Sequence, residues 1–399
     1  MTTQEPSFTI GIEEEYLLVD LETRDLAADP PPELADALHD TLGSQVTSEF
    51  MRCQVETETV VCGTIAEARA ELARLRSGVA ACAARFGLAP IAASTHPFAD
   101  WSTQRNTDKE RYNEIARDLQ VVARRLLISG MHVHVGIENE PLRFDIFNQL
   151  PYFLPHMLAL STSSPFWRGD NTGLHSYRLA VWNEVPRTGL PPKFASPDEF
   201  HRTVDVLINA GEIEDGTKIW WDLRPSARFP TIEMRITDMC PRLDDTVAIA
   251  ALYRCVARML YRLRRENQRW RDYSSFLVNE NRWLAQRFGT TQSMIDFGKG
   301  AAIPFADLAD ELIALVEEDA DFFGCRAEVA RIRQIAIEGT SADRQIVVFD
   351  KAVTAGESHD AALRAVVDHL IEESLVGCDV EQPVTPPIAK QTEVAGKAS

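Results

Sequence analysis

Four short segments of the chain carry ionisable side chains at positions i and i+2. Successive side chains of a β-strand point to opposite faces, so this spacing puts both members of each pair on one face. The pairs are Glu13 with Glu15, Glu56 with Glu58, His132 with His134, and Glu233 with Arg235. The alternate positions of these segments carry apolar residues, such as Val133 and Ile232, which would pack on the opposite face. The sequence therefore predicts four strands that direct carboxylates, imidazoles and a guanidinium at one surface.

Such a surface would be costly inside a packed core, because an unpaired buried charge is strongly unfavourable. We therefore predict a wet cavity that holds cations. Several carboxylates with one or two imidazoles suit hard divalent ions such as Mg²⁺ or Mn²⁺, which prefer oxygen ligands and leave positions open for phosphate oxygens. Taken alone, the acidic triplet at 13–15 also fits solvated surface, and the two histidines also fit a hydrogen-bonded pair or a zinc pair.

Arginines on and near the fourth segment add anion-binding capacity. Arg224, Arg228 and Arg235 offer planar donors that can hold phosphate or carboxylate groups. Metal ions beside such arginines indicate phosphoryl transfer, in which the ions neutralise the developing charge. The sequence contains neither G-x-x-x-x-G-K-[ST] nor G-x-G-x-x-G, so nothing supports a P-loop, kinase-like or Rossmann nucleotide site.

Apolar periodicity and turn residues predict the elements that position these groups. Strands are predicted at 8–20, 48–63, 88–98 and 128–138, with a pair of strands within 220–239. Helices are predicted at 64–86, 108–128, 145–161, 196–215 and 244–271, and largely helical structure from Met294 onward. Most arginines of 244–271 are predicted to form a solvated helix face. No clean linker divides the chain, so we predict one domain over 1–378 and a disordered tail over 379–399.

Composition narrows the class of protein. The net charge of −19 argues against a protein that captures nucleic acid or anionic lipid by electrostatics. No apolar run reaches the length of a membrane helix, and the first residues lack a secretory signal, so the expected location is cytoplasmic. The seven cysteines include no CxxC pair and are predicted to be reduced thiols.

The motifs together resemble the carboxylate-amine ligase family of the YbdK type, within the glutamine synthetase and γ-glutamylcysteine synthetase superfamily. The similarity runs through nearly the whole chain except the two termini. It is carried by FTIGIEEEYLLVD, QVETET, STHPFADW, RY at 111–112, GMHVHVGI, LALSTSSPFWRGDNTG, GLPPKF, WDLRPS, PTIEMRITD, NENRWLAQRFG and GTSADRQ. The resemblance implies an α+β fold: a curved, mostly antiparallel sheet forms an active-site basin with helices packed outside, and ATP and two to three Mg²⁺ or Mn²⁺ ions lie inside it.

The resemblance also implies roles for individual residues. The metal ligands would be Glu13, Glu15, Glu56, His132 and Glu233, with Glu49 as an additional ligand. His134 would contact phosphate or nucleotide, Arg235 the substrate carboxylate or transferred phosphate, and Arg224 would clamp phosphate. Arg344 is assigned to cofactor binding on its motif alone. Family members usually carry an uncharged polar residue where Glu58 stands. Glu58 can therefore equally be a carboxylate that faces solvent and has no role in the site.

The implied activity is an ATP-dependent ligation of a carboxylate, the γ-carboxylate of glutamate, to an amine such as cysteine through an acyl phosphate. Two alternatives stay open from the sequence. The same cavity could support metal-dependent hydrolysis of an amide or isopeptide, or nucleotide binding without catalysis. ATP consumption separates the ligase from the hydrolase. The expected partners are small-molecule substrates, and a homodimer is the default assembly.

Overall fold

A seven-stranded antiparallel sheet forms the centre of the fold. The computed structural model describes residues 4–378. The strands follow the order β2-β3-β1-β5-β9-β8, and β4 pairs with β1 in addition. Their bounds are β1 Ile10–Asp20, β2 Val46–Ser48, β3 Gln54–Glu58, β4 Leu88–Ile91, β5 Met131–Gly136, β8 Leu223–Pro225 and β9 Thr231–Met234. The predicted α+β class with a mostly antiparallel sheet is confirmed.

The register of the sheet brings the predicted pairs side by side. Glu13 on β1 lies opposite His132 on β5 and opposite Glu58 on β3. In the same way, His134 lies opposite Glu233 on β9. The alternation that the sequence predicted thus becomes one continuous polar face across four neighbouring strands.

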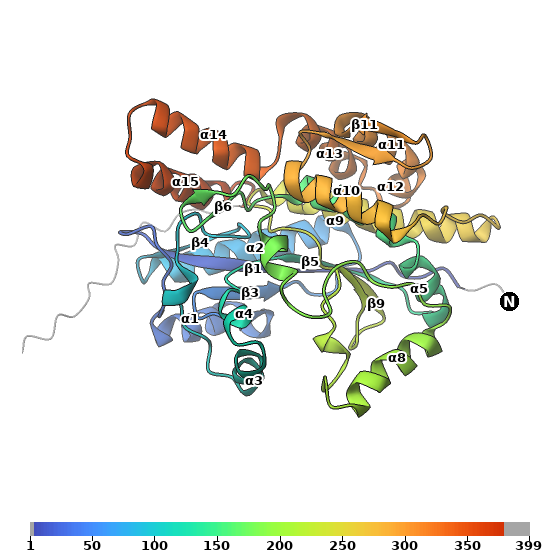
Figure 1. The fold of residues 1–399 in the computed structure, drawn as a ribbon, viewed down its shortest axis with the longest axis horizontal. Coiled ribbons are helices and arrows are strands. Elements are labelled where there is room, and N and C mark those ends of the chain that lie inside the picture. The colour runs from blue at the N-terminus through green and yellow to red at the C-terminus, as the bar shows by residue number, and fades with distance from the viewer. Residues whose placement is uncertain (1–3, 379–399) are drawn as a thin grey trace, which may run out of the picture.

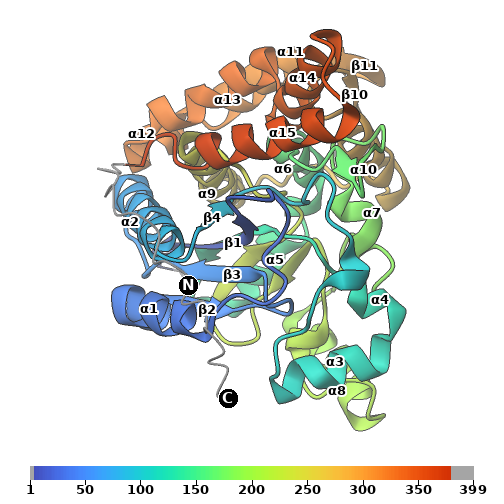
Figure 2. The same ribbon diagram turned by 90° about the vertical axis from the view of Figure 1, so that its left-hand side faces the viewer.

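The other face of the sheet packs against helices and forms the larger hydrophobic core. Ile12, Val133 and Ile232 are fully buried there together with residues of α2 (Ile65–Ala84) and α9 (Leu243–Arg265). Figure 2 shows α2 on one side of the strands and α3 (Glu110–Leu119) and α4 (Val121–Arg124) on the other. Burial of apolar side chains on one face leaves the polar face open for chemistry.

The remaining helices surround this sheet, and within residues 4–378 none is long and apolar enough to cross a membrane. In Figure 1, α11 to α15 lie together on one side of the sheet, and α3 and α8 lie on the opposite side. Their bounds are α1 Pro32–Leu42, α5 Glu140–Phe147, α6 Leu154–Ser161, α7 Arg178–Trp182, α8 Pro197–Asn209, α10 Ser275–Phe288, α11 Phe305–Leu315, α12 Glu317–Phe323, α13 Arg326–Glu338, α14 Ser341–Thr354 and α15 His359–Glu373.

Two predicted helices are interrupted. The helix predicted at 108–128 ends after Leu119, because Gln120 has a φ of 52° and so leaves the right-handed helical conformation. The helix predicted at 145–161 is three separate pieces: the end of α5, a 3₁₀ turn over Leu150–Tyr152, and α6. Pro151 and Pro155 lack the N–H that a continuous helix needs, and each stands at the start of a new piece.

Other predictions need smaller corrections. The strand predicted at 48–63 is shorter in the structure, where β3 covers Gln54–Glu58 and only Ser48 belongs to β2. The segment after Ser163, where neither a strand nor a helix is predicted, contains a short hairpin of β6 (Phe166–Trp167) and β7 (Asp170–Asn171). A second hairpin, β10 (Ser293–Asp296) with β11 (Ala301–Pro304), lies at the start of the region from Met294 onward for which largely helical structure was predicted, and helices follow it. The predicted disordered tail, 379–399, lies outside the described residues, and the single domain stays a prediction.

The arginine face predicted on 244–271 is confirmed in part, since Arg264, Arg265, Arg269 and Arg271 are exposed and three other arginines are not. The helix α9 ends at Arg265, and Arg254 is buried. Arg258 and Arg262 form ion pairs with the fully buried Asp319 of α12, at 2.7 and 3.0 Å. These arginines therefore join α9 to the outer helices rather than face solvent, and charge spacing alone cannot show such a non-local partner.

Candidate active site

The polar face of the sheet lines a cavity of about 340 Å³. Its floor is formed by β1, β3, β5 and β9, and α3 and the segment 217–229 contribute its rim. The lining includes every predicted site residue except Arg344: Glu13, Glu15, Glu49, Glu56, His132, His134, Arg224, Glu233 and Arg235. Glu58 and Arg228 line it as well. The structure therefore brings together residues that lie up to about two hundred positions apart in the chain.

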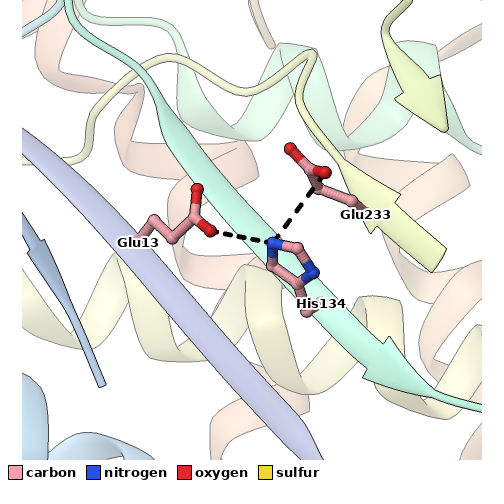
Figure 3. Close-up of side chains that lie close together, drawn as sticks. All are labelled: Glu13, His134 and Glu233. Atoms are coloured by element: carbon pink, nitrogen blue, oxygen red, sulfur yellow. Dashed lines mark hydrogen bonds and ion pairs between the residues drawn. The ribbon is translucent and has the colours of Figure 1, made fainter. Parts of the chain in front are cut away.

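Glu13 is the centre of a hydrogen-bonded cluster. One carboxylate oxygen lies 2.8 Å from Nδ1 of His132, and the other lies 3.0 Å from Nε2 of His134. The same Nε2 lies 4.0 Å from Glu233, so one imidazole stands between two carboxylates (Figure 3). Burial disfavours the charged form of Glu13, but its hydrogen bonds with His132 and His134 outweigh burial and hold its pKa well below the usual value. Glu13 is thus an anionic ligand candidate.

Three groups of side chains could each hold a metal ion. In each group the candidate ligand atoms lie within 4.8 Å of one another. The groups are Glu13 with His134 and Glu233, Glu13 with Glu56 and His132, and Glu15 with Glu49 and Glu56. Both histidines therefore reach candidate ligand positions, although the sequence assigned that role to His132 alone.

The carboxylates of the third group repel one another. Burial and the charge of Glu49 raise the pKa of Glu15 to about 8. Burial, followed by the charge of Glu49, also raises the pKa of Glu56 well above its usual value. Glu15 accepts a hydrogen bond from the backbone N–H of Gly130 at 2.7 Å, which compensates only part of this cost. A cation bound between these groups would relieve the repulsion.

The opposite side of the cavity is cationic. Arg224 donates to Glu233 through Nε at 2.7 Å and through Nη2 at 3.1 Å, and its Nη1 donates to two backbone carbonyls. Arg235 also contacts Glu233, but its Nε has no hydrogen-bond partner among residues 4–378. Despite burial, Arg235 and Arg224 hold the pKa of Glu233 far below its usual value. Arg235 therefore retains a free donor for an anion, whereas every donor nitrogen of Arg224 is engaged within the chain.

Some lining residues were not assigned by the sequence. Arg111 and Tyr112 on α3 line the cavity, and Arg111 approaches Thr217 on the facing rim at 3.5 Å. Trp182 and Trp220 add aromatic surface. The RY motif at 111–112 was the only signal for the first pair, and nothing in the local pattern distinguished the two tryptophans from core residues.

Arg344 is not brought to the cavity. Its Nε donates to Glu373 of α15 at 2.5 Å, and its Nη1 donates to the carbonyl of Gly339. It lies 3.6 Å from Asp245 at the start of α9. This position indicates that Arg344 links α14 to α15 and to the start of α9.

Comparison with known proteins identifies the family. The model of glutamate-cysteine ligase family 2 matches residues 9–369. A protein of Jannaschia sp. is 59% identical over 372 residues, which are 93% of this chain and 98% of that protein. A protein of Rhodospirillum rubrum is 57% identical over 386 residues, 95% of this chain and 99% of that one. Both carry the description "Putative glutamate--cysteine ligase 2".

Solved structures show the same fold at low sequence identity. The glutamate–cysteine ligase of Francisella tularensis in complex with AMP superposes with a TM-score of 0.68 at 14% identity, over 94% of this chain and 90% of that one. A bifunctional glutathione synthetase from Pasteurella multocida gives 0.64 at 12% identity, over 92% of this chain and 52% of that one. The predicted family resemblance and the prediction of a ligase-type enzyme are confirmed: the chain belongs to glutamate-cysteine ligase family 2.

Proposed function

We propose that the protein is an ATP- and Mg²⁺-dependent carboxylate-amine ligase that joins the γ-carboxylate of glutamate to an amine. The observation that carries the proposal is the convergence of three ligand groups beside Arg235, from β1, β3, β5, β9 and the segment between β2 and β3. The names of the relatives support a glutamate and cysteine substrate pair, and the AMP in the Francisella complex supports a nucleotide.

The residues present fit divalent ions. The donor set consists mainly of carboxylate oxygens with two imidazoles, which suits Mg²⁺ or Mn²⁺. Glu13, Glu15, Glu49, Glu56, His132 and Glu233 would hold two to three ions, and the geometry allows His134 to share this role. When bound, the ions supply positive charge that neutralises phosphate oxygens.

The arginines have different tasks in this proposal. Arg235, with its unpartnered Nε, would bind the substrate carboxylate or the transferred phosphoryl group. Arg224 would fix the carboxylate of Glu233, because it donates to both of its oxygens. His134 donates or accepts at Nδ1 opposite Thr231 at 3.0 Å, which fixes its ring beside Glu13. The roles of His134 and Arg224 as direct phosphate contacts remain predictions.

The proposed reaction has two steps. A carboxylate oxygen of glutamate attacks the γ-phosphorus of ATP, which forms an acyl phosphate and releases ADP. The amine nitrogen then attacks the acyl carbon, the bond to the phosphate oxygen breaks, and the amine loses a proton. The products are an amide, ADP and inorganic phosphate. Donors of Arg235 that are already in place would stabilise the charge that develops on the transferred group.

ADP release tests this proposal. Purified protein is incubated with ATP, Mg²⁺ and glutamate and a panel of amines that includes cysteine, with a reaction lacking amine as control. We expect ADP release that depends on one amine and a matching amide in the mass spectrum. Hydrolysis of that amide without ATP, together with amine-independent ADP release, would contradict the ligase proposal. The homodimer and the cytoplasmic location stay predictions of the sequence.

A further inference from the structure

Two cysteine thiols lie in contact far from the cavity. Cys255 belongs to α9, and Cys325 is the residue directly before α13. Their sulfur atoms are 3.7 Å apart, and the two residues are 0% and 1% exposed. They are separated by 70 positions in the sequence, so the contact joins α9 to the junction between α12 and α13.

A buried guanidinium lies beside this pair. Arg254 is 2% exposed, and its Nη2 donates to the carbonyl of Gly63 at 2.7 Å. Within residues 4–378, its Nε and Nη1 have no hydrogen-bond partner. The guanidinium lies 4.0 Å from the centre of the Phe323 ring, which shields it from water. A buried cation with two unsatisfied donors is costly, and a thiolate nearby would supply a counter-charge.

The two sulfur atoms are electrostatically unequal. The hydrogen bond from Cys255, opposed by burial and assisted by Arg254, lowers the pKa of Cys325 below its usual value. The same hydrogen bond, together with burial, raises the pKa of Cys255. The pair therefore combines a sulfur that favours the thiolate with a neighbouring sulfur that keeps its proton, and the thiolate is the reactive form of cysteine.

We propose that Cys255 and Cys325 form a peroxide-reactive dithiol that closes to an intramolecular disulfide. The Cys325 thiolate attacks one oxygen of hydrogen peroxide, the O–O bond breaks, and sulfenic acid and hydroxide form. The Cys255 sulfur then attacks the sulfenic sulfur, an S–S bond forms and the S–O bond breaks. Two thiols and one peroxide thus give one disulfide and two waters. The burial of both sulfur atoms selects a small oxidant over a bulky disulfide such as oxidised glutathione.

The surrounding structure allows the sulfur atoms to close. A disulfide needs an S–S distance of about 2 Å. The two sulfur atoms are 3.7 Å apart, so the movement that closes the bond is shorter than one residue of the chain. The side chain of Cys325 would make this movement, because Cys325 stands between α12 and α13 rather than within a helix. Cys255 lies within α9 and would stay fixed.

Peptide mapping tests the proposal. The full chain is treated with hydrogen peroxide, the peroxide is removed, remaining thiols are blocked with N-ethylmaleimide in urea, and the protein is digested without reductant. We expect a cross-linked peptide containing Cys255 and Cys325 that disappears after dithiothreitol, and no such peptide after treatment with oxidised glutathione. Recovery of both cysteines as blocked thiols, at a peroxide dose that oxidises a cysteine peptide added as internal standard, would overturn the proposal.

Variants separate the roles of the three residues. Cys325→Ser should abolish the cross-link, whereas Cys82→Ser, which changes another buried cysteine on α2, should leave it unchanged. Arg254→Met should slow disulfide formation about tenfold because the thiolate loses its counter-charge, and Arg254→Lys should restore much of the rate. Equal rates in Arg254→Met and the parent chain, with the same circular dichroism spectrum, would overturn the role of the guanidinium.

Discussion

Neighbouring glutamates on β1 show how differently the two faces of the sheet treat charge. Glu14 points into the core, where its carboxylate accepts hydrogen bonds from Arg76 at 2.9 Å and from Tyr16 at 2.5 Å. Glu15 points into the cavity, where the nearby carboxylate of Glu49 adds to the cost of its burial. The core face thus neutralises its charge within the chain. The cavity face pairs Glu13 and Glu233 but leaves Glu15 and Glu56 beside other carboxylates, which is the arrangement expected when ions supply the missing charge.

Removal of Glu233 should have the largest effect on this contrast. We expect Glu233→Gln to reduce amine-dependent ADP release by about a thousandfold, because a metal ligand and the acceptor for two arginines are both lost. The amide keeps the shape of the side chain, so the circular dichroism spectrum should not change. Turnover is measured at saturating ATP and glutamate.

Glu58→Gln is the matched control for this prediction. Glu58 also lines the cavity and lies opposite Glu13, but it belongs to none of the three candidate metal groups. Its substitution should change ADP release by no more than a few fold. A loss in Glu58→Gln as large as that in Glu233→Gln would contradict the assignment of the ligand groups.

Loss of an ion pair on the core face should lower the stability of the protein more than loss of an ion pair at the surface. Arg76→Met leaves the fully buried Glu14 without its cation, and we expect the free energy of unfolding to fall by about 3–5 kcal/mol. Urea denaturation followed by circular dichroism measures this change. Arg74→Met is the control, because Arg74 pairs with Glu71 near the surface of the same helix and should contribute less than about 1 kcal/mol. Similar losses in both variants would remove the distinction between buried and surface pairs.

The sequence predicts the features that depend on neighbouring residues, but it does not predict contacts between residues far apart in the chain. The alternation in GIEEEY and MHVHVG predicts the polar face, because the period of a strand is a local property. The partner of Glu14 could not be predicted, since Arg76 lies 62 positions away on α2 and resembles any other helix arginine. For the same reason the sequence could not distinguish Arg254 and Arg258, which contact α12, from the exposed arginines of the same segment. It also missed the break at Gln120, where a single backbone angle outweighs a good amphipathic pattern.

The cavity itself was predicted from four pairs of side chains, but the roles within it were less readable. From the residue pattern, Arg224 and Arg235 have the same anion-binding character. Only the hydrogen bonds distinguish them, because Arg224 uses its donors on Glu233 and on backbone carbonyls. Tyr112 lay in a motif without an assigned role, since its contact with the cavity depends on the placement of α3 over the sheet.

Histidines extend the comparison to pH. His134 in the cavity contacts Glu13, whereas His96 is buried with Nε2 at 2.9 Å from the carbonyl of Arg24 and Nδ1 accepting the N–H of Ala99. Burial lowers the pKa of His96 to about 4. The unfolded chain therefore binds the proton first as pH falls below about 6.5, so stability should be lost between that pH and about 4, by up to about 3 kcal/mol.

Urea denaturation at pH 7 and at pH 5 tests this dependence. His96→Asn should make the difference between the two pH values smaller, because one buried neutral imidazole is removed. The exposed His201 is the control, and His201→Asn should leave the difference unchanged. An unchanged pH dependence in His96→Asn would show that other groups dominate the acid sensitivity.

The smallest predicted change is in the free energy of unfolding of the protein when its cavity holds no metal ions. Glu56→Gln should raise the free energy of unfolding of the EDTA-treated protein by about 1 kcal/mol, since a buried carboxylate beside Glu49 and Glu13 is replaced by a neutral amide. Mg²⁺ at about one hundred times its dissociation constant should stabilise the parent chain by about 2.7 kcal/mol, and Glu56→Gln should lose most of that gain. Thermal melting with and without Mg²⁺ measures both changes, with Glu58→Gln as the variant that keeps the response. If EDTA-treated Glu56→Gln is less stable than the parent chain, the carboxylates of the cavity are already compensated within the protein, and the contrast between the two faces of the sheet fails.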